Sequence, residues 1–389
     1  MSNITLFSQV LSKLDRSAFK KLVKSKQTDK HQKGFTSWGH LVSMLFCQFA
    51  NSKSLRDISK GLKSATGNLN HLGIVRAPSK SSIAYQNKNR DWTLFRDYYY
   101  ALLSSLGQQL PYARTKFKIK SKIFLLDATT ISLCLSLFDW AKYKTKKGAV
   151  KMHTMLDYDG HLPTYVNITD GKTADNKGAY DLPLLKNSVI VADRFYNDFS
   201  LLNIWDSSGV FFVIRHKNNL QFTSIREKEL SDHRNQHILI DEIIELKGKL
   251  SYSKFPKKLR RVAVWDDKNK QEIELITNHM TWSANTISEL YKARWDIEIF
   301  FRDIKQQLHI KSFIGTSENA VMIQIWSALI SILLLKALKA IAQYNWYLSN
   351  LVAFIRLNLF VKIDLQEWLD HPFEERPPPK NEYVQGVLF

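Results

Sequence analysis

The chain has 389 residues, with 56 Lys and Arg against 36 Asp and Glu, and a formal net charge of +20. It is too long for one simple hydrophobic core, which predicts two or three domains, and its 12% aromatic content excludes wholesale disorder. Residues 1–120 hold 21 Lys and Arg against five Asp, and so carry +16 of the total. A region this basic is expected to bind a polyanion: nucleic acid in the first place, with an anionic membrane as the alternative.

Residues 1–107 are predicted to form an all-helical DNA-binding domain. The stretches "ITLFSQVLSKL", "WGHLVSMLFCQFA" and "SLRDISKGL" carry the apolar spacing of helices. A polar and basic helix follows Pro78, and a short helix, a turn and such a second helix outline a helix-turn-helix. The alternative is a basic helix that is simply exposed to solvent. The candidate DNA-contacting residues on this helix are Lys80, Ser81, Tyr85, Lys88 and Arg90.

After a basic linker over residues 108–121, the pattern changes to that of a mixed α/β core over residues 122–315. "KIFLLDATTISL" predicts an apolar strand that carries Asp127 near its end, and two strands joined by a turn at "DYDG" follow. A helix-like stretch through "AYDLPLL" precedes a buried strand that delivers Asp193 in "SVIVADRFYND". A helix and the strand "GVFFVIR" complete the order β-β-β-α-β-α-β, which predicts a mixed sheet with helices packed against it.

The remainder of the chain divides into three predicted segments. Residues 216–281 are polar and strand-like and predict a β-rich insertion, after which helical spacing resumes in "SANTISELYKARWDIEIFF", with Ser283 suited to the start of that helix. Residues 316–372 predict C-terminal helices, and residues 373–389 form a proline-rich tail that should be extended.

A membrane or secreted location is not expected. The longest apolar stretch, residues 325–335, is bounded by Gln324 and Lys336; it is too short to span a bilayer and predicts a buried helix. The N-terminal sequence lacks the basic region and apolar run of a secretory signal. Cys47 and Cys134 form no metal-binding pattern and suggest no disulfide framework, so a reducing cytoplasm is the expected location.

Four polar residues recur among apolar ones in "YKARWDIEIFFRDIK". At about 100° of rotation per residue, Tyr291, Arg294 and Lys305 lie within about 40° of Glu298 around the helix. Their line runs beside an apolar stripe, which places it where the wall of a cleft would be. The alternative is a solvated face with an Arg294–Glu298 pair, worth roughly a few tenths of a kcal/mol.

The candidate catalytic and metal-binding residues are Asp127, Asp193 and Glu298. A carboxylate beside a buried strand is costly unless it is paired, hydrogen-bonded or metal-bound. Oxygen ligands suit Mg²⁺ or Mn²⁺, and two such ions about 4 Å apart are a common solution for phosphoryl transfer. An Asp at a strand end is often a turn or cap residue instead. That alternative explains one such Asp better than it explains two together with a glutamate on a Tyr/Arg/Lys line.

With these carboxylates and this polar line, the chain resembles a bacterial insertion-sequence transposase of the DDE type, of the insertion-sequence-four class. That class is marked by Tyr-x2-Arg-x3-Glu-x6-Lys, and Tyr291, Arg294, Glu298 and Lys305 fit the signature without a gap. The segments "FLLDATTISL", "VIVADRFYND" and "KSFIGTSENAVMIQIW" are similar to the same class. The start of the chain resembles the helical domain that often precedes such catalytic cores.

The resemblance implies a fold and a place for each carboxylate. The expected fold is an RNase H-like catalytic core with a β-rich insertion, preceded by the all-α domain. Asp127 would lie on the first strand, Asp193 on the fourth, and Glu298 on the helix after the insertion. These residues would hold two Mg²⁺ ions, for which Mn²⁺ could substitute.

The resemblance also implies a reaction and partners. The expected activity is metal-dependent cleavage at transposon ends and strand transfer into target DNA, in some members through a DNA hairpin. Tyr291, Arg294 and Lys305 would hold end phosphates; Arg194 could reach phosphate too, or pair with a carboxylate of the sheet. The expected partners are double-stranded DNA, comprising terminal inverted repeats and target, and a second copy of the chain in a synaptic homodimer.

Two other functions stay open: an RNase H-like nuclease that nicks without joining, and a catalytically silent DNA-binding protein derived from a transposase. The intact acidic residues and signature oppose the second of these. Three further side chains are interpreted as structural. Trp265 could stack on an unpaired base, but a core packing role is favoured, and Trp295 is interpreted as a packing residue. His153 is interpreted as a buried histidine with a hydrogen-bond partner and not as a ligand.

Overall fold

The computed structural model of the protein describes residues 3–65, 67–107, 117–133, 140, 142–144, 147–216, 220–230, 237–308, 310 and 313–374. Of the predicted basic linker it covers residues 117–121, and of the proline-rich tail it covers residues 373 and 374. The rest of both segments lies outside the described residues, as does Cys134.

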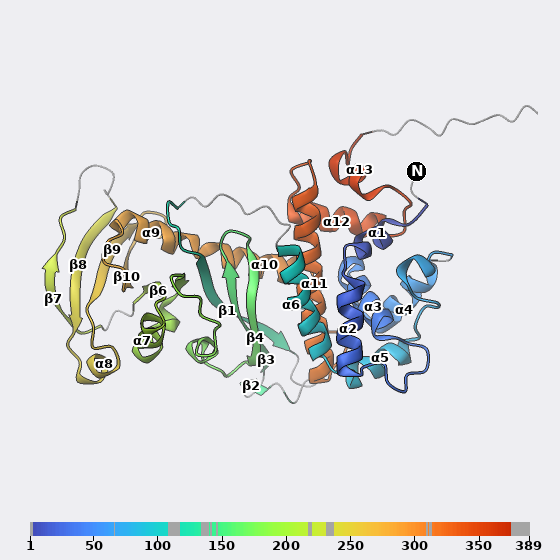
Figure 1. Ribbon diagram of the computed structural model, residues 1–389, viewed down its shortest axis with the longest axis horizontal. Coiled ribbons are helices and arrows are strands. Elements are labelled where there is room, and N and C mark those ends of the chain that lie inside the picture. Colours follow the sequence, from blue (N-terminus) through green and yellow to red (C-terminus); the bar gives the residue numbers. More distant parts are fainter. Residues whose placement is uncertain are drawn as a thin grey trace, which may run out of the picture.

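Helices from both ends of the chain pack together in one part of the molecule, called here the helical end (Figure 1). Several of them begin at a residue whose hydroxyl accepts a backbone N–H of the first turn, as Thr36, Ser54 and Ser79 do. The helices of this end are α1 (Leu6–Ser12), α2 (Arg16–Lys26), α3 (Ser37–Ala50), α4 (Leu55–Ser64), α5 (Lys80–Asn89), α6 (Thr93–Gly107), α11 (Glu318–Ile341), α12 (Leu348–Asn358) and α13 (Leu365–Asp370).

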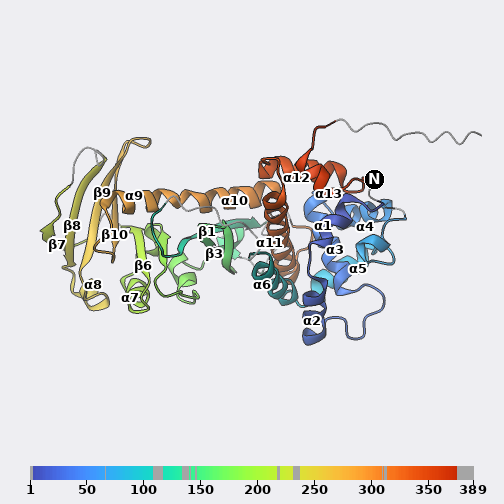
Figure 2. The same ribbon diagram turned by 45° about the horizontal axis from the view of Figure 1, so that its top comes forward.

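The long helix α11 runs through the helical end and packs against α3, α5 and α6 (Figure 2). In the described part of the chain it is the one helix long and apolar enough to cross a membrane by length and composition, but most of its residues are buried inside the protein. The prediction of a buried helix is therefore confirmed. The helix extends beyond this apolar stretch at both ends and has 24 residues, which lie within the predicted C-terminal helices of residues 316–372.

The predicted helix-turn-helix is wrong in its connection. Residues 65–79, which include η1 (Asn70–Leu72), separate α4 from α5, whereas the turn of that motif has about three or four residues. Leu72 and Ile74 in this connection are buried, so it is part of the core and not a bare turn. The two helices still contact one another.

The other part of the molecule is built on one sheet (Figure 1). Its described strands follow the order β2-β3-β1-β5-β6-β10-β9-β8-β7, and β4 pairs with β3 outside that path. The strands are β1 (Ile123–Leu133), β2 (Lys142–Lys144), β3 (Lys147–Asp157), β4 (Leu162–Asp170), β5 (Val189–Ala192), β6 (Phe211–Arg215), β7 (Phe222–Glu227), β8 (Ile238–Leu246), β9 (Leu259–Asp266) and β10 (Gln271–Thr277).

The strands β4-β3-β1-β5-β6 form the core of this sheet. β1, β5 and β6 are parallel neighbours, and β3 is antiparallel to both β1 and β4. β5 is buried along its whole length, as an apolar strand covered on both faces must be. This is the strand arrangement expected of an RNase H-like core, so the predicted mixed α/β fold with a helical N-terminal region is confirmed.

The predicted β-rich insertion is present as β7 to β10, with the short helix α8 (Lys249–Lys254) between β8 and β9. The structure adds that β10 pairs antiparallel with β6. The insertion is therefore a continuation of the core sheet. Because this pairing joins segments that are far apart in sequence, no local pattern in either strand announces it.

Two details of the core differ from the sequence-based expectation. The stretch "AYDLPLL" was expected to be helical, but within the described residues it follows a single 3-10 turn, η3 (Asp175–Ala179), and contains no α-helix. The short β2 adds a strand, so Asp193 follows the fifth described strand and not the fourth. The helix α7 (Phe199–Ser207) lies where it was predicted.

Trp265 was interpreted as a core packing residue and His153 as a buried histidine with a hydrogen-bond partner, and the structure bears out only the second interpretation. Trp265 is 39% exposed on β9, opposite Glu272 of β10, so that interpretation is wrong. His153 is buried, and its Nε2 lies 3.0 Å from Thr169 Oγ1, which confirms a buried histidine with a hydrogen-bond partner.

His40 ties α3 to α5 inside the helical end. Its side chain is fully buried, and Nε2 lies 2.7 Å from Asn87 Oδ1. Burial, helped by the nearby Arg90 guanidinium, lowers the pKa of His40 from 6.5 to about 3. The folded protein therefore keeps His40 neutral at a pH at which the unfolded chain would protonate it. This contribution to stability is complete above about pH 6.5 and is lost progressively as the pH falls towards 3.

We predict that lowering the pH from 7 to 5.5 reduces the free energy of unfolding by about 1 kcal/mol through His40 alone. The measurement is the change in melting temperature between the two pH values for the wild type and for His40→Gln. The variant should show a smaller loss on acidification, because its side chain has no proton to gain. Equal losses in the two proteins would contradict the assignment.

Candidate functional site

A rod of two helices carries the polar line predicted from the sequence (Figure 2). α9 (Ala284–Ala293) and α10 (Trp295–Gln307) meet at Arg294, whose backbone remains right-handed helical at φ −54° and ψ −28°. The predicted helix over residues 291–305 is thus close to correct. The predicted apolar stripe is buried at Leu290, Ile297, Phe301, Ile304 and Leu308, while Ala293 is half-buried.

Arg294 joins this rod to the centre of the sheet. One terminal guanidinium nitrogen lies 3.4 Å from Asp127 Oδ2, and the other lies 2.7 Å from Glu298 Oε1. The Arg294 side chain is 11% exposed and that of Asp127 is 16% exposed. The alternative of a solvated Arg294–Glu298 pair is right about the pair and wrong about Arg294, because the guanidinium is enclosed between two carboxylates, whereas the Glu298 side chain is 37% exposed.

The sheet register brings Asp127 and Asp193 side by side. Leu126 of β1 pairs with Ala192, the last residue of the parallel strand β5, so the two aspartates follow at the same level. Asp193 then caps the short turn η4 (Arg194–Tyr196), where the Phe195 N–H donates to its Oδ1 at 2.8 Å. The prediction that Asp127 lies near a strand end is wrong for β1 itself, because β1 continues along β3 to Leu133. It does lie where the pairing with β5 stops.

The three carboxylates Asp127, Asp193 and Glu298 have less positive charge around them than their own negative charge requires. The pKa of Asp127 is raised from 3.8 to about 7, first by burial and then by the negative charges of Asp193 and Glu298. The Ala128 N–H and the Arg294 guanidinium oppose this rise without cancelling it. Burial also raises the pKa of Asp193. The Arg294 guanidinium contacts Asp127 and Glu298, and the charges of Arg294 and Arg194 oppose the rise at Asp193 without cancelling it. The site therefore favours additional positive charge.

The remaining signature residues lie along the same rod. Tyr291 is buried, and its ring lies 5.7 Å from the centre of the Arg294 guanidinium. Lys305 Nζ donates to Thr129 Oγ1 at 2.6 Å and to the Thr130 carbonyl at 2.9 Å. Lys305 thus meets β1 two and three residues beyond Asp127, which holds the rod against that strand at a second point.

Two exposed aromatic rings lie beside the site, and the sequence reasoning assigned neither of them to it. Trp295 is 55% exposed next to Arg294, so its interpretation as a packing residue is wrong: it points away from the buried stripe. Phe195 is 57% exposed directly after Arg194, which is itself exposed. The available signal was that both rings adjoin a signature arginine or a strand-end aspartate.

The predicted DNA-contacting residues of α5 divide into two groups. The exposed members are Lys80, Ser81, Tyr85 and Lys88. Arg90 is buried: it donates to the carbonyls of Phe35 and Thr36 and lies 3.6 Å from Asp29. The prediction that Arg90 contacts DNA is therefore corrected, because its guanidinium is used inside the helical end.

The three carboxylates supply oxygen donors, the ligand type that Mg²⁺ and Mn²⁺ prefer. Among the described residues, no three His, Cys, Asp or Glu side chains already lie at metal-ligand spacing. Arg294 accounts for part of this, since its two terminal nitrogens hold Asp127 and Glu298. Carboxylate oxygens are the right type of ligand for a divalent ion at this site. An ion bound by both carboxylates would have to displace the guanidinium from between them.

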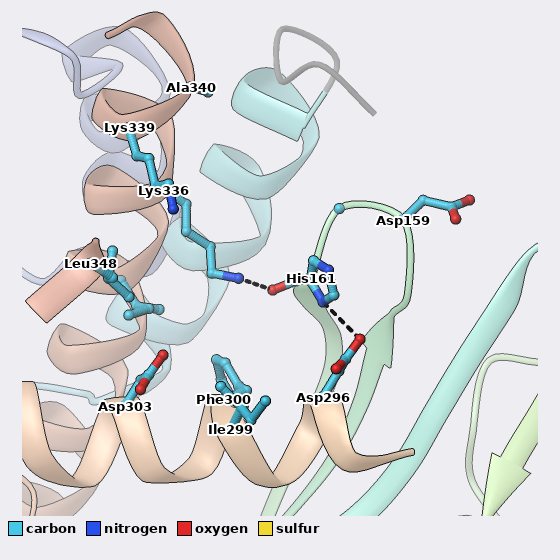
Figure 3. Close-up of a pocket in the computed structure, with 12 residues that line it drawn as sticks. Asp159, His161, Asp296, Ile299, Phe300, Asp303, Lys336, Lys339, Ala340 and Leu348 are labelled. Carbon is cyan, nitrogen blue, oxygen red and sulfur yellow. Dashed lines mark hydrogen bonds and ion pairs between the residues drawn. The ribbon is translucent and has the colours of Figure 1, made fainter. Parts of the chain in front are cut away.

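A cavity of about 570 Å³ lies on another side of α10 (Figure 3). Its lining includes the β3–β4 turn, α10 and the second half of α11, and none of the three carboxylates. Lys336 of α11 donates to the carbonyl of His161, whose Nδ1 lies 3.9 Å from Asp296 Oδ2. Burial lowers the pKa of Lys336 to about 8. These contacts brace α10 between the sheet and the helical end.

Comparisons with known proteins show which family the chain is similar to. The family described as Transposase DDE domain matches residues 118–334, and a domain of unknown function (DUF4372) matches residues 2–75. The chain is 28% identical over 278 residues to the "Probable transposase for insertion sequence element IS5377" of Geobacillus stearothermophilus, covering 71% of this chain and 72% of that protein. It is 23% identical over 220 residues to the transposase InsG for insertion sequence element IS4 of Escherichia coli, covering 53% of this chain and 48% of that protein.

A solved structure, the piggyBac transposase synaptic complex with hairpin DNA, superimposes with a TM-score of 0.44 at 9% identity, over 96% of this chain and 81% of the other. The family match spans more than half of the chain, so the chain belongs to the Transposase DDE domain family. It is a transposase of the IS4 family, as the Tyr-Arg-Glu-Lys signature predicted. Membership of this family implies phosphoryl-transfer catalysis, DNA binding and the use of divalent metal ions in general terms.

We predict that Arg294→Met lowers the free energy of unfolding by about 2 kcal/mol in metal-free buffer, because it leaves the carboxylates without their shared cation. The loss should be smaller at pH 6 than at pH 8, since Asp127, with its pKa of about 7, is largely protonated at the lower pH. Melting temperatures in EDTA at both pH values measure this. Arg302→Met, on the exposed side of α10, serves as the control. A loss independent of pH would count against the carboxylate cluster.

Proposed function

We propose that the protein is a DNA transposase that cleaves transposon ends and transfers them to a target, with Asp127, Asp193 and Glu298 as its catalytic and metal-binding residues. The observation that carries this proposal is the position of Asp127 beside Asp193 at the β1–β5 register, with Glu298 joined to Asp127 through Arg294. When bound, two Mg²⁺ or Mn²⁺ ions would activate the attacking oxygen and stabilise the leaving one. The raised pKa values of both aspartates support a site that takes up positive charge.

The other side chains of the rod hold the DNA. Arg294 offers a fork suited to phosphate and Lys305 a point charge, and both lie next to β1, within reach of a strand bound over the carboxylates. Tyr291 packs against Arg294 and limits where its guanidinium can go. Exposed Arg194 adds a further contact to the end phosphates.

The helical end recognises the terminal inverted repeats through the exposed face of α5, and two copies of the chain join the ends in a synaptic homodimer. The excess of Lys and Arg over Asp in residues 1–120 supports a duplex-binding role for this part of the protein. The protein acts in the bacterial cytoplasm, where its DNA substrates lie.

We predict that Asp193→Asn and Glu298→Gln each abolish cleavage of labelled DNA carrying the element's ends in Mg²⁺, while binding of those ends changes less than about threefold, because the phosphate contacts remain. Asp303→Asn is the matched control: this carboxylate is also on α10 but lines the separate cavity. Gel assays of cleavage and joining measure the result. Retained cleavage in Asp193→Asn would end the proposal.

The same assay separates the two alternative functions. Nicking of the ends without a joined product in a supercoiled plasmid would identify a nuclease. End binding without cleavage by the wild type, in either Mg²⁺ or Mn²⁺, would identify a silent DNA-binding protein. EDTA is the control for both, since cleavage that survives chelation would exclude the metal-dependent mechanism.

We predict different effects for two basic residues of the α5 region. Lys88→Gln should weaken binding to end DNA and lower the slope of log affinity against log salt concentration by about 1, because one phosphate contact is lost. Arg90→Gln should lower the melting temperature and leave that slope unchanged, because Arg90 is buried. Fluorescence anisotropy over a salt series decides this, and an unchanged slope in Lys88→Gln would remove that residue from the interface.

A further inference from the structure

A loop over residues 278–282 precedes the rod formed by α9 and α10, and residues of the inserted strands contact this loop. Arg260 of β9 is fully buried, and its Nε and one terminal nitrogen both donate to the Asp241 carboxylate at 2.7 Å. Its other terminal nitrogen donates to the carbonyls of Met280 and Trp282. One buried guanidinium thus binds β8 on one side and the loop on the other.

Two further contacts fix the same loop. Lys228 Nζ, at the end of β7, donates to the Met280 carbonyl at 2.8 Å. The rings of His279 and Trp282 stack with their centroids 3.6 Å apart, and the backbone N–H of Trp282 donates to His279 Nδ1. Ser283 follows and caps α9 by accepting the Thr286 N–H. Core residues hold the loop as well, because Asn278 bonds to Asp206 and to the Phe212 N–H, and the Phe211 ring packs against His279. The direction in which α9 leaves the sheet is therefore set jointly by the core and by groups of the insertion.

The direction of α9 matters because the site lies far along the rod. From Ser283 to Glu298 the helix rises about 22 Å, so a tilt of about 3° at Ser283 moves Glu298 by about 1 Å. Misplacement of a reacting group by about 1 Å can cost about 100-fold in rate. A buried ion pair is often no more stabilising than an apolar pair of similar size. The distinctive property of Arg260 is that it donates to two specific carbonyls.

We propose that Arg260, held by Asp241, is a positioning residue of the transposition reaction. It aims the rod that carries Tyr291, Arg294 and Glu298 at the two aspartates of the sheet. The β-rich insertion between Asp193 and Glu298 then serves as a brace for the second half of the site. This inference rests on the proposed function for its catalytic consequence, but its structural claim can be tested without DNA.

The next residue of β9 provides a matched control. Arg261 is also largely buried and also ion-paired, to Glu242 at 2.6 Å and to Glu274 at 2.7 Å. Those partners lie on β8 and β10, and not in the loop. Arg261→Met removes the cation from a comparable charge cluster on the same strand, so it reports what the insertion loses when only its internal ion pairs are broken.

The test compares Arg260→Met, Arg261→Met and the double variant Arg260→Met/Asp241→Leu on the full chain. The double variant removes both buried charges, so it should recover most of the melting temperature lost in Arg260→Met. Hydrogen exchange of residues 283–293 is measured without DNA, and binding and cleavage of end DNA are measured in Mg²⁺. We expect both variants that lack Arg260 to exchange faster over 283–293 and to cleave about 100-fold more slowly, with end binding unchanged. Arg261→Met should keep wild-type exchange there and lose less than about threefold in cleavage.

Three outcomes would overturn the inference. One is unchanged exchange over residues 283–293 in Arg260→Met, and another is recovery of cleavage in the double variant along with its stability. The third is an equal loss of cleavage in Arg261→Met at a matched melting temperature. If the wild type cleaves no DNA, the proposed function fails. The exchange comparison would still decide whether Arg260 sets the direction of α9.

Discussion

The Arg294 guanidinium between Asp127 and Glu298 is the interaction on which the rest of the structure depends. It is where the helical rod meets β1, the middle strand of the core of the sheet, and it places a positive charge between two of the three clustered carboxylates. Without charge compensation, burial and mutual repulsion would drive these groups to take up protons or move apart. The fold therefore holds acidic groups together with one cation, and metal ions would complete this compensation in the proposed reaction.

Asp127 of β1 and Glu298 of the rod meet at Arg294, and this requires the rod to be fixed at both ends. At its start, Arg260 and Lys228 hold the loop before α9. Beyond Glu298, Lys305 bonds to β1, and contacts around His161 and Lys336 brace another side of α10 (Figure 3). The rod is therefore supported by inserted strands, core sheet and helical end in turn. Figure 2 shows the extended course that the two helices follow between these supports.

The sequence was sufficient where short-range patterns carry the information. The alternating and apolar strands, the stripe from Leu290 to Leu308 and the spacing of the signature each depend on residues close in the chain. It was insufficient where the answer depends on a distant partner. Arg90 looked like a DNA contact, but Asp29 and two carbonyls near Thr36 hold it inside the helical end. Trp295 was interpreted as a packing residue, but the sequence of the helix does not show on which side the sheet lies. That position decides whether the ring is buried, and the structure leaves it exposed.

Two long-range contacts shape the molecule: β10 pairs with β6, and α11 packs against the N-terminal helices. Both join segments separated by long stretches of chain, which neither composition nor periodicity can specify. Through them the insertion becomes part of the core sheet, and the helix that follows the catalytic rod becomes part of the basic helical end. The helices that carry the positive charge and the helix that carries Glu298 therefore belong to one packed structure. Under the proposed function, DNA bound at the helical end would be held in a defined orientation to the carboxylates by this packing.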